Sequence, residues 1–156
     1  MKRVALAPLL ALAACTTTSG DVASLADTGP TPDQIVAARQ ASFNLSAVAF
    51  GGMRAASEGT AEAKAQSFAA RGLSRWANAL PGMFPSGTQL PNSRALSTVW
   101  SDRSGFDAQA TLFQTATAQL LAAAQADDKT AFAAAYKATG AACASCHAAY
   151  RSEAPR

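Results

Sequence analysis

Cys143-Ala144-Ser145-Cys146-His147 is the stretch that decides how this 156-residue chain is organised. The pattern Cys-x-x-Cys-His is typical of covalent attachment of a c-type haem. Two intervening residues let both sulfurs reach one porphyrin edge, and the adjacent imidazole can turn toward the iron. We therefore expect one covalently bound haem c, held by Cys143 and Cys146, with His147 as an axial iron ligand.

Two other kinds of site contain a Cys-x-x-Cys pair, namely redox dithiols and zinc sites. A dithiol does not need the histidine that follows, and a zinc site needs a fourth ligand. Outside the motif the chain has no histidine and a single further cysteine, Cys15. The sequence therefore favours haem.

The amino terminus predicts export. Lys2 and Arg3 precede an apolar run, residues 4–13, that has the length of a signal-peptide core and is too short to span a bilayer. Leu12-Ala13-Ala14-Cys15 has the form of a bacterial lipobox, in which cleavage leaves a lipid-modified cysteine at the new amino terminus. An ordinary signal peptide followed by an accidental cysteine is the alternative.

We therefore predict a lipoprotein signal peptide at residues 1–14 and a lipidated tether, rich in Thr, Ser, Gly, Asp and Pro, at residues 15–30. Lipidation would explain Cys15, because an unpaired thiol is a liability in an oxidising compartment. Residues 31–156 are the size of a single domain. The expected location is the periplasmic side of the bacterial envelope, with the lipid as the only membrane anchor, or the soluble periplasm if Cys15 is not lipidated.

Charge gives no support for nucleic-acid binding. The net charge of +3 includes Lys2 and Arg3, so a chain that starts at Cys15 keeps 11 basic residues against 10 acidic ones. Haem propionates would then make the protein slightly negative.

Periodicity and Gly/Pro punctuation predict four helices and no strand, over residues 31–57, 60–80, 104–126 and 129–150. Pro32 and Asp33 suit a first helical turn, and Thr60 can cap the second helix. Two short turns and one longer loop, at residues 81–103, join these helices. The prediction is an all-α, antiparallel, up-down-up-down four-helix bundle.

Helical spacing places the haem motif on a face that carries several large side chains. In the last helix this stripe contains Phe132, Tyr136, Gly140, Cys143, His147 and Tyr150. The inward stripe of the first helix is expected to contain Ile35, Arg39, Phe43, Phe50 and Met53. That of the second is expected to contain Phe68, Trp76 and Leu80, and that of the third Phe106, Phe113, Leu120 and Leu121. Gly140 either leaves room for the macrocycle or is merely tolerated, and both interpretations stay open.

Four segments in this order resemble the cytochrome c′ family, over residues 32–151 as a whole. They are Arg39-Gln40 followed by Phe43, the Phe84-Pro85-x-Gly87-Thr88 loop, Trp100-Ser101-Asp102, and the ending from Cys143 to Arg151. The lipobox and tether depart from the family, whose members are usually soluble periplasmic proteins.

The resemblance implies that His147 is the proximal ligand, that Arg39 and Gln40 lie near the haem propionates, that Arg151 lies beside the proximal face, and that Phe43 covers the distal face. The residues agree in part. Arg39 shares the inward stripe, and a buried arginine needs an anion such as a propionate. Arg151 follows His147 by four residues, although it could also be a frayed terminal cation.

A sixth iron ligand is hard to find in this sequence. Position 43, where six-coordinate relatives carry methionine, is phenylalanine. Met53 lies about 15 Å further along the helix at 1.5 Å per residue. Met83, in the Pro/Gly loop, is less firmly excluded. We therefore predict a five-coordinate iron with a vacant, apolar distal side capped by Phe43.

The resemblance implies binding of nitric oxide, with carbon monoxide weaker and dioxygen excluded, since no distal hydrogen-bond donor is evident in the sequence. We expect a non-enzymatic protein that sequesters or transports nitric oxide, because a peroxidase would need a distal acid–base group. The alternative is a membrane-anchored one-electron carrier whose redox partner the sequence does not identify.

A second, uncharged stripe on the first helix predicts a homodimer. It consists of Ala38, Ala41, Leu45, Val48 and Gly52. The alternative is a bundle rotated so that this stripe faces a neighbouring helix.

Overall fold

The computed structural model describes residues 29–153, so the predicted signal peptide, Cys15 and nearly all of the tether lie outside the described residues. The chain forms α-helices and short 3-10 helices (η), as expected. In order, they are α1 (Pro32–Gly52), α2 (Arg54–Ser57), η1 (Lys64–Gln66), α3 (Ser67–Ala79), η2 (Leu80–Met83), α4 (Thr98–Ser101), α5 (Arg103–Ala126) and α6 (Lys129–Tyr150). Within residues 29–153 no helix is long and apolar enough to cross a membrane.

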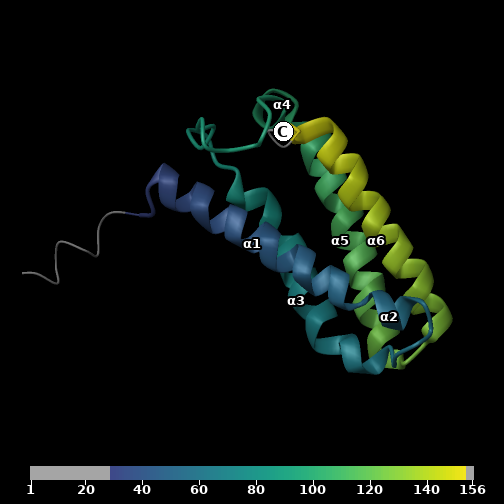
Figure 1. Cartoon of the computed structure of the whole chain (residues 1–156). Coiled ribbons are helices and arrows are strands. Elements are labelled where there is room, and N and C mark those ends of the chain that lie inside the picture. Colours follow the sequence, from purple (N-terminus) through teal and green to yellow (C-terminus); the bar gives the residue numbers. More distant parts are fainter. Residues whose placement is uncertain (1–28, 154–156) are drawn as a thin grey trace, which may run out of the picture.

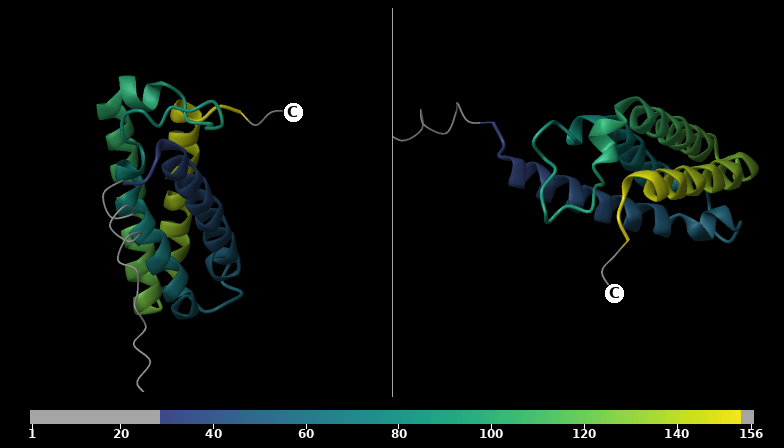
Figure 2. Two further views of the ribbon diagram at one scale, coloured as in Figure 1. Left: turned by 90° about the vertical axis from the view of Figure 1, so that its left-hand side faces the viewer. Right: turned by 90° about the horizontal axis from the view of Figure 1, so that it is seen from above.

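The four long helices run up and down as two pairs, α1 with α3 and α5 with α6 (Figure 1). The pairs lie close together near α2 and diverge toward α4, as the views in Figure 2 also show. This is the predicted antiparallel four-helix bundle, opened at one end.

Side-chain caps explain where three of the long helices begin. Thr31 and Gln34 form a capping box at the start of α1. Asp102 accepts a hydrogen bond from the Gly105 backbone N–H at the start of α5, and Asp128 does the same for Ala131 at the start of α6. The predicted bounds of these two helices hold to within a residue.

The second predicted helix is shorter than expected, because Thr60 does not cap it. Thr60 instead donates its hydroxyl hydrogen bond back to Ala55 O at 2.9 Å, and so closes the turn after α2. The chain then passes through η1, and regular α-helix begins at Ser67. The predicted helix is therefore absent over residues 60–63, and residues 64–66 form a 3-10 helix in place of an α-helix.

The predicted first helix and middle loop also need correction. Met53 interrupts the first helix, and α2 follows it as a separate turn. The loop, expected to contain no regular element, holds the end of η2 and the whole of α4.

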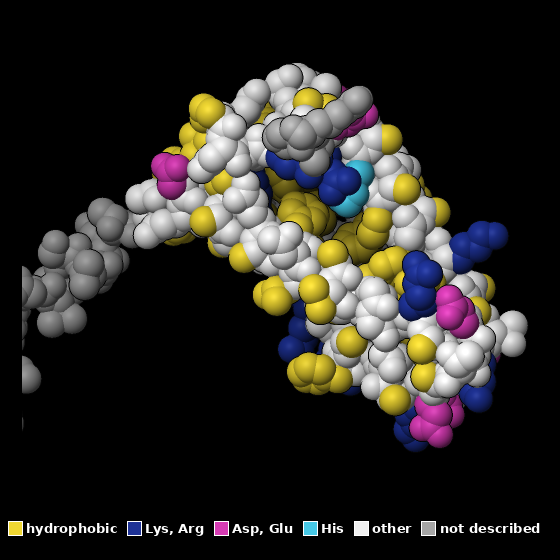
Figure 3. Space-filling view, viewed as in Figure 1, with side chains coloured by type: hydrophobic (Ala, Val, Ile, Leu, Met, Phe, Trp, Pro, Cys, Tyr) yellow, Lys and Arg dark blue, Asp and Glu magenta, His cyan; other side chains and the backbone are white. Residues whose placement is uncertain are grey.

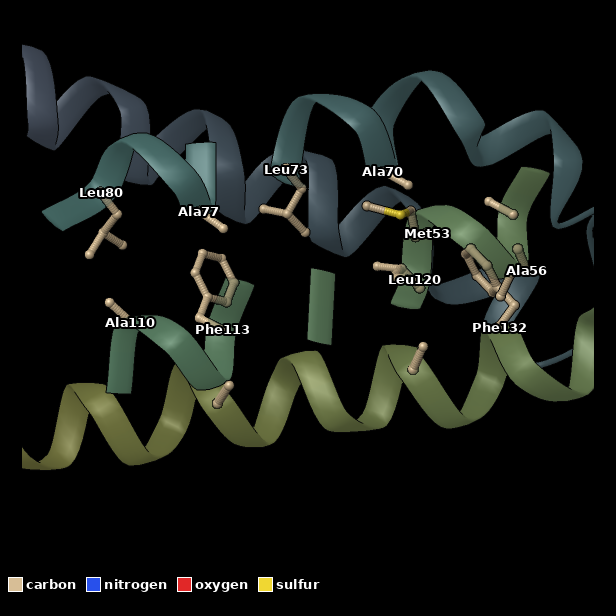
Figure 4. Packing of buried hydrophobic residues seen from close by; sticks show 14 of the residues in the cluster. Met53, Ala56, Ala70, Leu73, Ala77, Leu80, Ala110, Phe113, Leu120 and Phe132 are labelled. Carbon is tan, nitrogen blue, oxygen red and sulfur yellow. The ribbon is translucent and has the colours of Figure 1, made fainter. Parts of the chain in front are cut away.

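The closed end of the bundle is filled by fully buried side chains, among them Met53, Leu120 and Phe132 (Figure 4). Phe68 does not join them. It was predicted to face inward but is 89 % exposed, because the buried face of α3 contains Ala70, Leu73 and Ala77 instead. Phe68 lies about 140° around the helix from Leu73 and about 180° from Ala77 at 100° per residue.

Candidate haem site

The open end of the bundle encloses a cavity of about 640 Å³, which is within the range of cofactor sites. Cys143, Cys146 and His147 of α6 line it on one side, and Phe43 of α1 lines it on another. Figure 3 shows the hollow with an apolar floor, the histidine at its edge and basic side chains at its mouth. The structure thus brings the predicted haem ligands and Phe43 to one cavity.

The haem motif lies in the last two turns of α6, where helical geometry holds its three reactive side chains near one face. Burial raises the pKa of both the Cys143 and the Cys146 thiols, although nearby Arg151 opposes the shift. Burial, with Arg151 and Arg94, lowers the pKa of His147. The imidazole is therefore neutral at pH 7, which is the form that binds iron.

Phe43 sits in an aromatic cluster at the centre of the cavity wall. Its ring centroid lies 5.2 Å from that of Trp76, 6.3 Å from that of Phe84 and 6.4 Å from the His147 ring. The first of these contacts is edge to face, with an interplanar angle of 87°. Phe43 is thus the aromatic side chain of α1 that faces His147. Its role as the distal cap stays a prediction.

Arg39 is buried, with 2 % of its surface exposed, and its guanidinium has protein partners of its own. It donates to Thr88 Oγ1 and Thr88 O at 2.8 Å each, to Ser93 Oγ at 2.7 Å and to Met83 O at 3.3 Å. It also lies 4.6 Å above the Phe84 ring. All of these acceptors are neutral, and burial lowers the pKa of Arg39.

Arg39 therefore ties the middle loop to α1, a role that the sequence did not reveal. It also lines the cavity, so its predicted contact with a propionate stays a prediction. Gln40, the next residue, donates to Asn92 O at 2.8 Å and lines the cavity as well. Its predicted place near the propionates is likewise untested.

Arg151 is not a frayed terminal cation. It is the first residue after α6, with an extended backbone that forms an isolated antiparallel bridge with Ala95. The flanking bonds from Leu96 N to Tyr150 O, 3.0 Å, and from Ser152 N to Arg94 O, 2.9 Å, fix the same segment. Arg151 lines the cavity at the edge where His147 lies.

Gly140 lies beside the Phe50 ring, which stacks on Tyr136 at a centroid distance of 4.2 Å. A Cβ at this position would lie 3.4 Å from that ring, which is an ordinary contact, so Phe50 does not require a glycine here. Both interpretations from the sequence stay open.

The structure adds cavity residues that sequence reasoning missed. Arg54 and Arg94 join Arg39 and Arg151 in the lining, and none of the lining residues within 29–153 is an aspartate or a glutamate. Arg94 lies in the irregular middle loop, where no periodicity could assign it to a face. Four arginines in this described lining, together with two thiols and a neutral imidazole, fit a c-type haem with its two propionates.

Comparison with known proteins agrees with this fit. A family model described as Cytochrome C′ matches residues 34–151. The chain is 34 % identical over 122 residues to the cytochrome c′ of Alcaligenes xylosoxydans xylosoxydans, which covers 77 % of this chain and 94 % of that protein.

Solved structures show the same architecture. Cytochrome c′ from Rubrivivax gelatinosus superposes with a TM-score of 0.74 at 31 % identity, over 80 % of this chain and all of that one. A nitric oxide complex and a carbon monoxide complex of variants of cytochrome c prime from Alcaligenes xylosoxidans each superpose with a TM-score of 0.74 at 30 % identity, over 81 % of this chain and 100 % of theirs. The chain therefore belongs to the cytochrome c′ family and carries one covalently bound c-type haem.

Proposed function

We propose that this protein binds nitric oxide, and carbon monoxide more weakly, at a five-coordinate haem whose vacant side faces Phe43. The observation that carries this proposal is the composition of the cavity wall. Among the lining residues that the structure describes, His147 carries the one imidazole, and none is a methionine or a lysine. Met53, the methionine nearest along α1, is fully buried in the closed end.

In this proposal Cys143 and Cys146 hold the haem, His147 binds its iron, and the haem supplies an iron with one open coordination position. Phe43 restricts access to that position, because Trp76 and Phe84 confine its ring. Apolar side chains around it exclude water. A diatomic ligand must therefore displace the ring, and nitric oxide, the strongest ligand, is the least deterred.

Similar proteins give the proposal independent support. Several of the solved cytochromes c′ that this chain resembles are nitric oxide complexes, and one is a carbon monoxide complex. They are about 30 % identical to this chain, and the aligned region covers the whole of their own chains.

We assign a binding role and no enzymatic one. In the described part of the chain the lining contains no aspartate or glutamate, and the hydroxyl of Tyr150, another lining residue, already donates to Asp102 at 2.7 Å. A protein of this kind would sequester or transport nitric oxide on the periplasmic side of the envelope, anchored through Cys15.

The ligand-binding spectrum of the reduced holoprotein tests this function. We expect a high-spin five-coordinate spectrum that changes on addition of nitric oxide or carbon monoxide. A low-spin six-coordinate spectrum that responds to neither gas would contradict the proposal and favour the one-electron carrier. Phe43→Ala should accelerate carbon monoxide binding, whereas Phe68→Ala, which changes an exposed phenylalanine, should leave the rate as it is.

We further propose that the protein is a homodimer through α1. The stripe of Ala38, Ala41, Leu45, Val48 and Gly52 is exposed along its whole length. Leu45 and Val48 are 70 % and 74 % exposed, so the bundle is not rotated to cover them, and a second copy would bury this surface.

Sedimentation of a lysine variant tests the dimer. Leu45→Lys should sediment as a monomer, because the dimer would bury the new charges. Leu112→Lys is the matched control, since Leu112 is 55 % exposed on α5, and should sediment like the original protein. A dimeric Leu45→Lys variant would rule out this interface.

A further inference from the structure

Trp76 carries a buried hydrogen-bond donor with nothing to donate to. Its indole Nε1 is the one buried side-chain nitrogen or oxygen without a hydrogen-bond partner among the described residues. Such groups are rare in folded proteins, because each loses its bonds to water and gains none in return. Trp76 lines the ligand cavity, but its Nε1 is closed off from the open space, so the donor becomes available to a ligand only when a neighbouring side chain moves.

The second tryptophan, Trp100, does have a hydrogen-bond acceptor for its indole N–H. Trp100 Nε1 donates to Pro85 O at 3.1 Å, and Trp100 does not line the cavity. Trp76 does line it. The two side chains are chemically identical, so their difference lies in what surrounds them.

The position of Trp76 relates it to the vacant side of the haem site. It comes from α3, which packs on α1, whereas His147 comes from α6 in the other helix pair. Phe43 contacts both, with ring centroids 5.2 Å from Trp76 and 6.4 Å from His147. The indole thus flanks the same Phe43 ring that a ligand must displace.

We propose that Trp76 is a specificity-determining residue whose indole N–H donates a hydrogen bond to a diatomic molecule bound on the Phe43 side. This inference rests on the proposed function and deepens it. When Phe43 moves aside, the ligand takes its place beside Trp76, and the unpaired N–H gains an acceptor. The sequence predicted no hydrogen-bond donor on the distal side; in this proposal the Trp76 indole is such a donor, screened by the Phe43 ring.

A donor at this position changes which ligands are retained. A hydrogen bond strengthens the binding of ligands whose outer atom gains negative charge, and it pulls electron density from the iron into the ligand. Bound nitric oxide would dissociate more slowly than from a wholly apolar pocket. Discrimination against dioxygen then depends on the Phe43 ring and not on the absence of a donor.

The test compares Trp76→Phe with Trp100→Phe in the reduced, haem-bearing protein under carbon monoxide. Trp76→Phe should move the C–O stretching band to higher frequency and accelerate carbon monoxide and nitric oxide dissociation by about twofold to tenfold, the range expected for one lost hydrogen bond. Trp100→Phe should change neither quantity, because its indole is bonded to the backbone outside the cavity.

A measurement on the unmodified protein covers the case in which the Trp76 variant fails to fold. In the ferrous carbon monoxide complex of the unmodified protein, exchange of the indole N–H for N–D in D2O should shift the C–O stretching band, as a direct hydrogen bond to the bound ligand requires. Binding of carbon monoxide with an unchanged stretch and rate in Trp76→Phe, or with no such shift, overturns this inference and leaves the proposed function standing. A native protein that binds no carbon monoxide overturns both.

Discussion

The two ends of this bundle are built from the same helices but packed in different ways. At the closed end Met53, Leu120 and Phe132 are completely buried against one another. At the open end Phe43, Trp76 and His147 are only half-buried around the cavity. Side chains of the protein fill the closed end, whereas the open end leaves a cavity that the haem fills.

The difference shows how the chain keeps a cavity open without losing its fold. The middle loop is bound to α1 by Arg39 and to the end of α6 by the Ala95–Arg151 bridge. These polar bonds tie the loop to both helices at the open end. Hydrogen bonds at the rim therefore hold the open end together, whereas close apolar packing holds the closed end together.

Preventing haem attachment should have the largest effect on the structure, and this effect should be confined to the open end of the bundle. In a Cys143→Ser, Cys146→Ser double variant, we expect amide hydrogen exchange to lose protection around Phe43 and Trp76, because a cavity of about 640 Å³ is left unfilled. Protection around Leu120 should persist. Equal loss along the whole of α5 would show that the ends are not independent.

A truncation at the closed end should destabilise the whole molecule. Phe132→Ala removes a completely buried ring and should lower the free energy of unfolding by about 3–5 kcal/mol, measured by denaturant titration. Leu112→Ala, at a position that is 55 % exposed, should change it by about 0.5 kcal/mol or less. Similar values for the two variants would contradict the assignment of the core.

Adding a methyl group to Gly105 tests the rim of the open end. A Cβ at Gly105 would overlap Asp102 Oδ2 and lie 2.5 Å from the Tyr150 hydroxyl. We expect Gly105→Ala to destabilise the protein by about 1–3 kcal/mol.

The control for this prediction is Gly72, which lies inside α3 with nothing near its added Cβ. Gly72→Ala should stabilise the protein by up to about 1 kcal/mol, as expected for a helix interior. Thermal unfolding measures both, and a stabilised Gly105→Ala variant would disprove the close contact.

The smallest predicted effect is an alkaline one, at the Asp102–Tyr150 contact. The hydrogen bond to Asp102, together with burial and the charge of Asp102, raises the pKa of Tyr150 from 10.0 to about 12. Because the folded state favours the protonated hydroxyl, this contribution to stability is complete below pH 10 and is lost as the pH rises toward about 12.

Denaturant unfolding at several pH values measures this contribution. Tyr150→Phe should be less stable than the original protein at pH 8, and the difference should shrink toward pH 12. A difference that stays constant across that range would mean that the hydroxyl does not titrate with folding.

Local sequence patterns predicted α5 and α6 well, because Asp102 and Asp128 are helix caps that act on their immediate neighbours. Prediction failed at Thr60 and Phe68. Thr60 had a competing acceptor in Ala55 O, and Phe68 lies away from the face of α3 that Ala70, Leu73 and Ala77 bury. Both outcomes depend on contacts that local propensity does not describe.

The sequence by itself determined the cofactor, its attachment to Cys143 and Cys146, and the all-α class, because covalent chemistry and helical periodicity are local properties. Only the tertiary structure decided that Arg39 is bonded to the middle loop, that Arg54 and Arg94 reach the cavity, and that Trp76 is left without an acceptor beside Phe43. The physical reason is that hydrogen-bond satisfaction and burial depend on neighbours from distant parts of the chain, which are known only once the helices are packed.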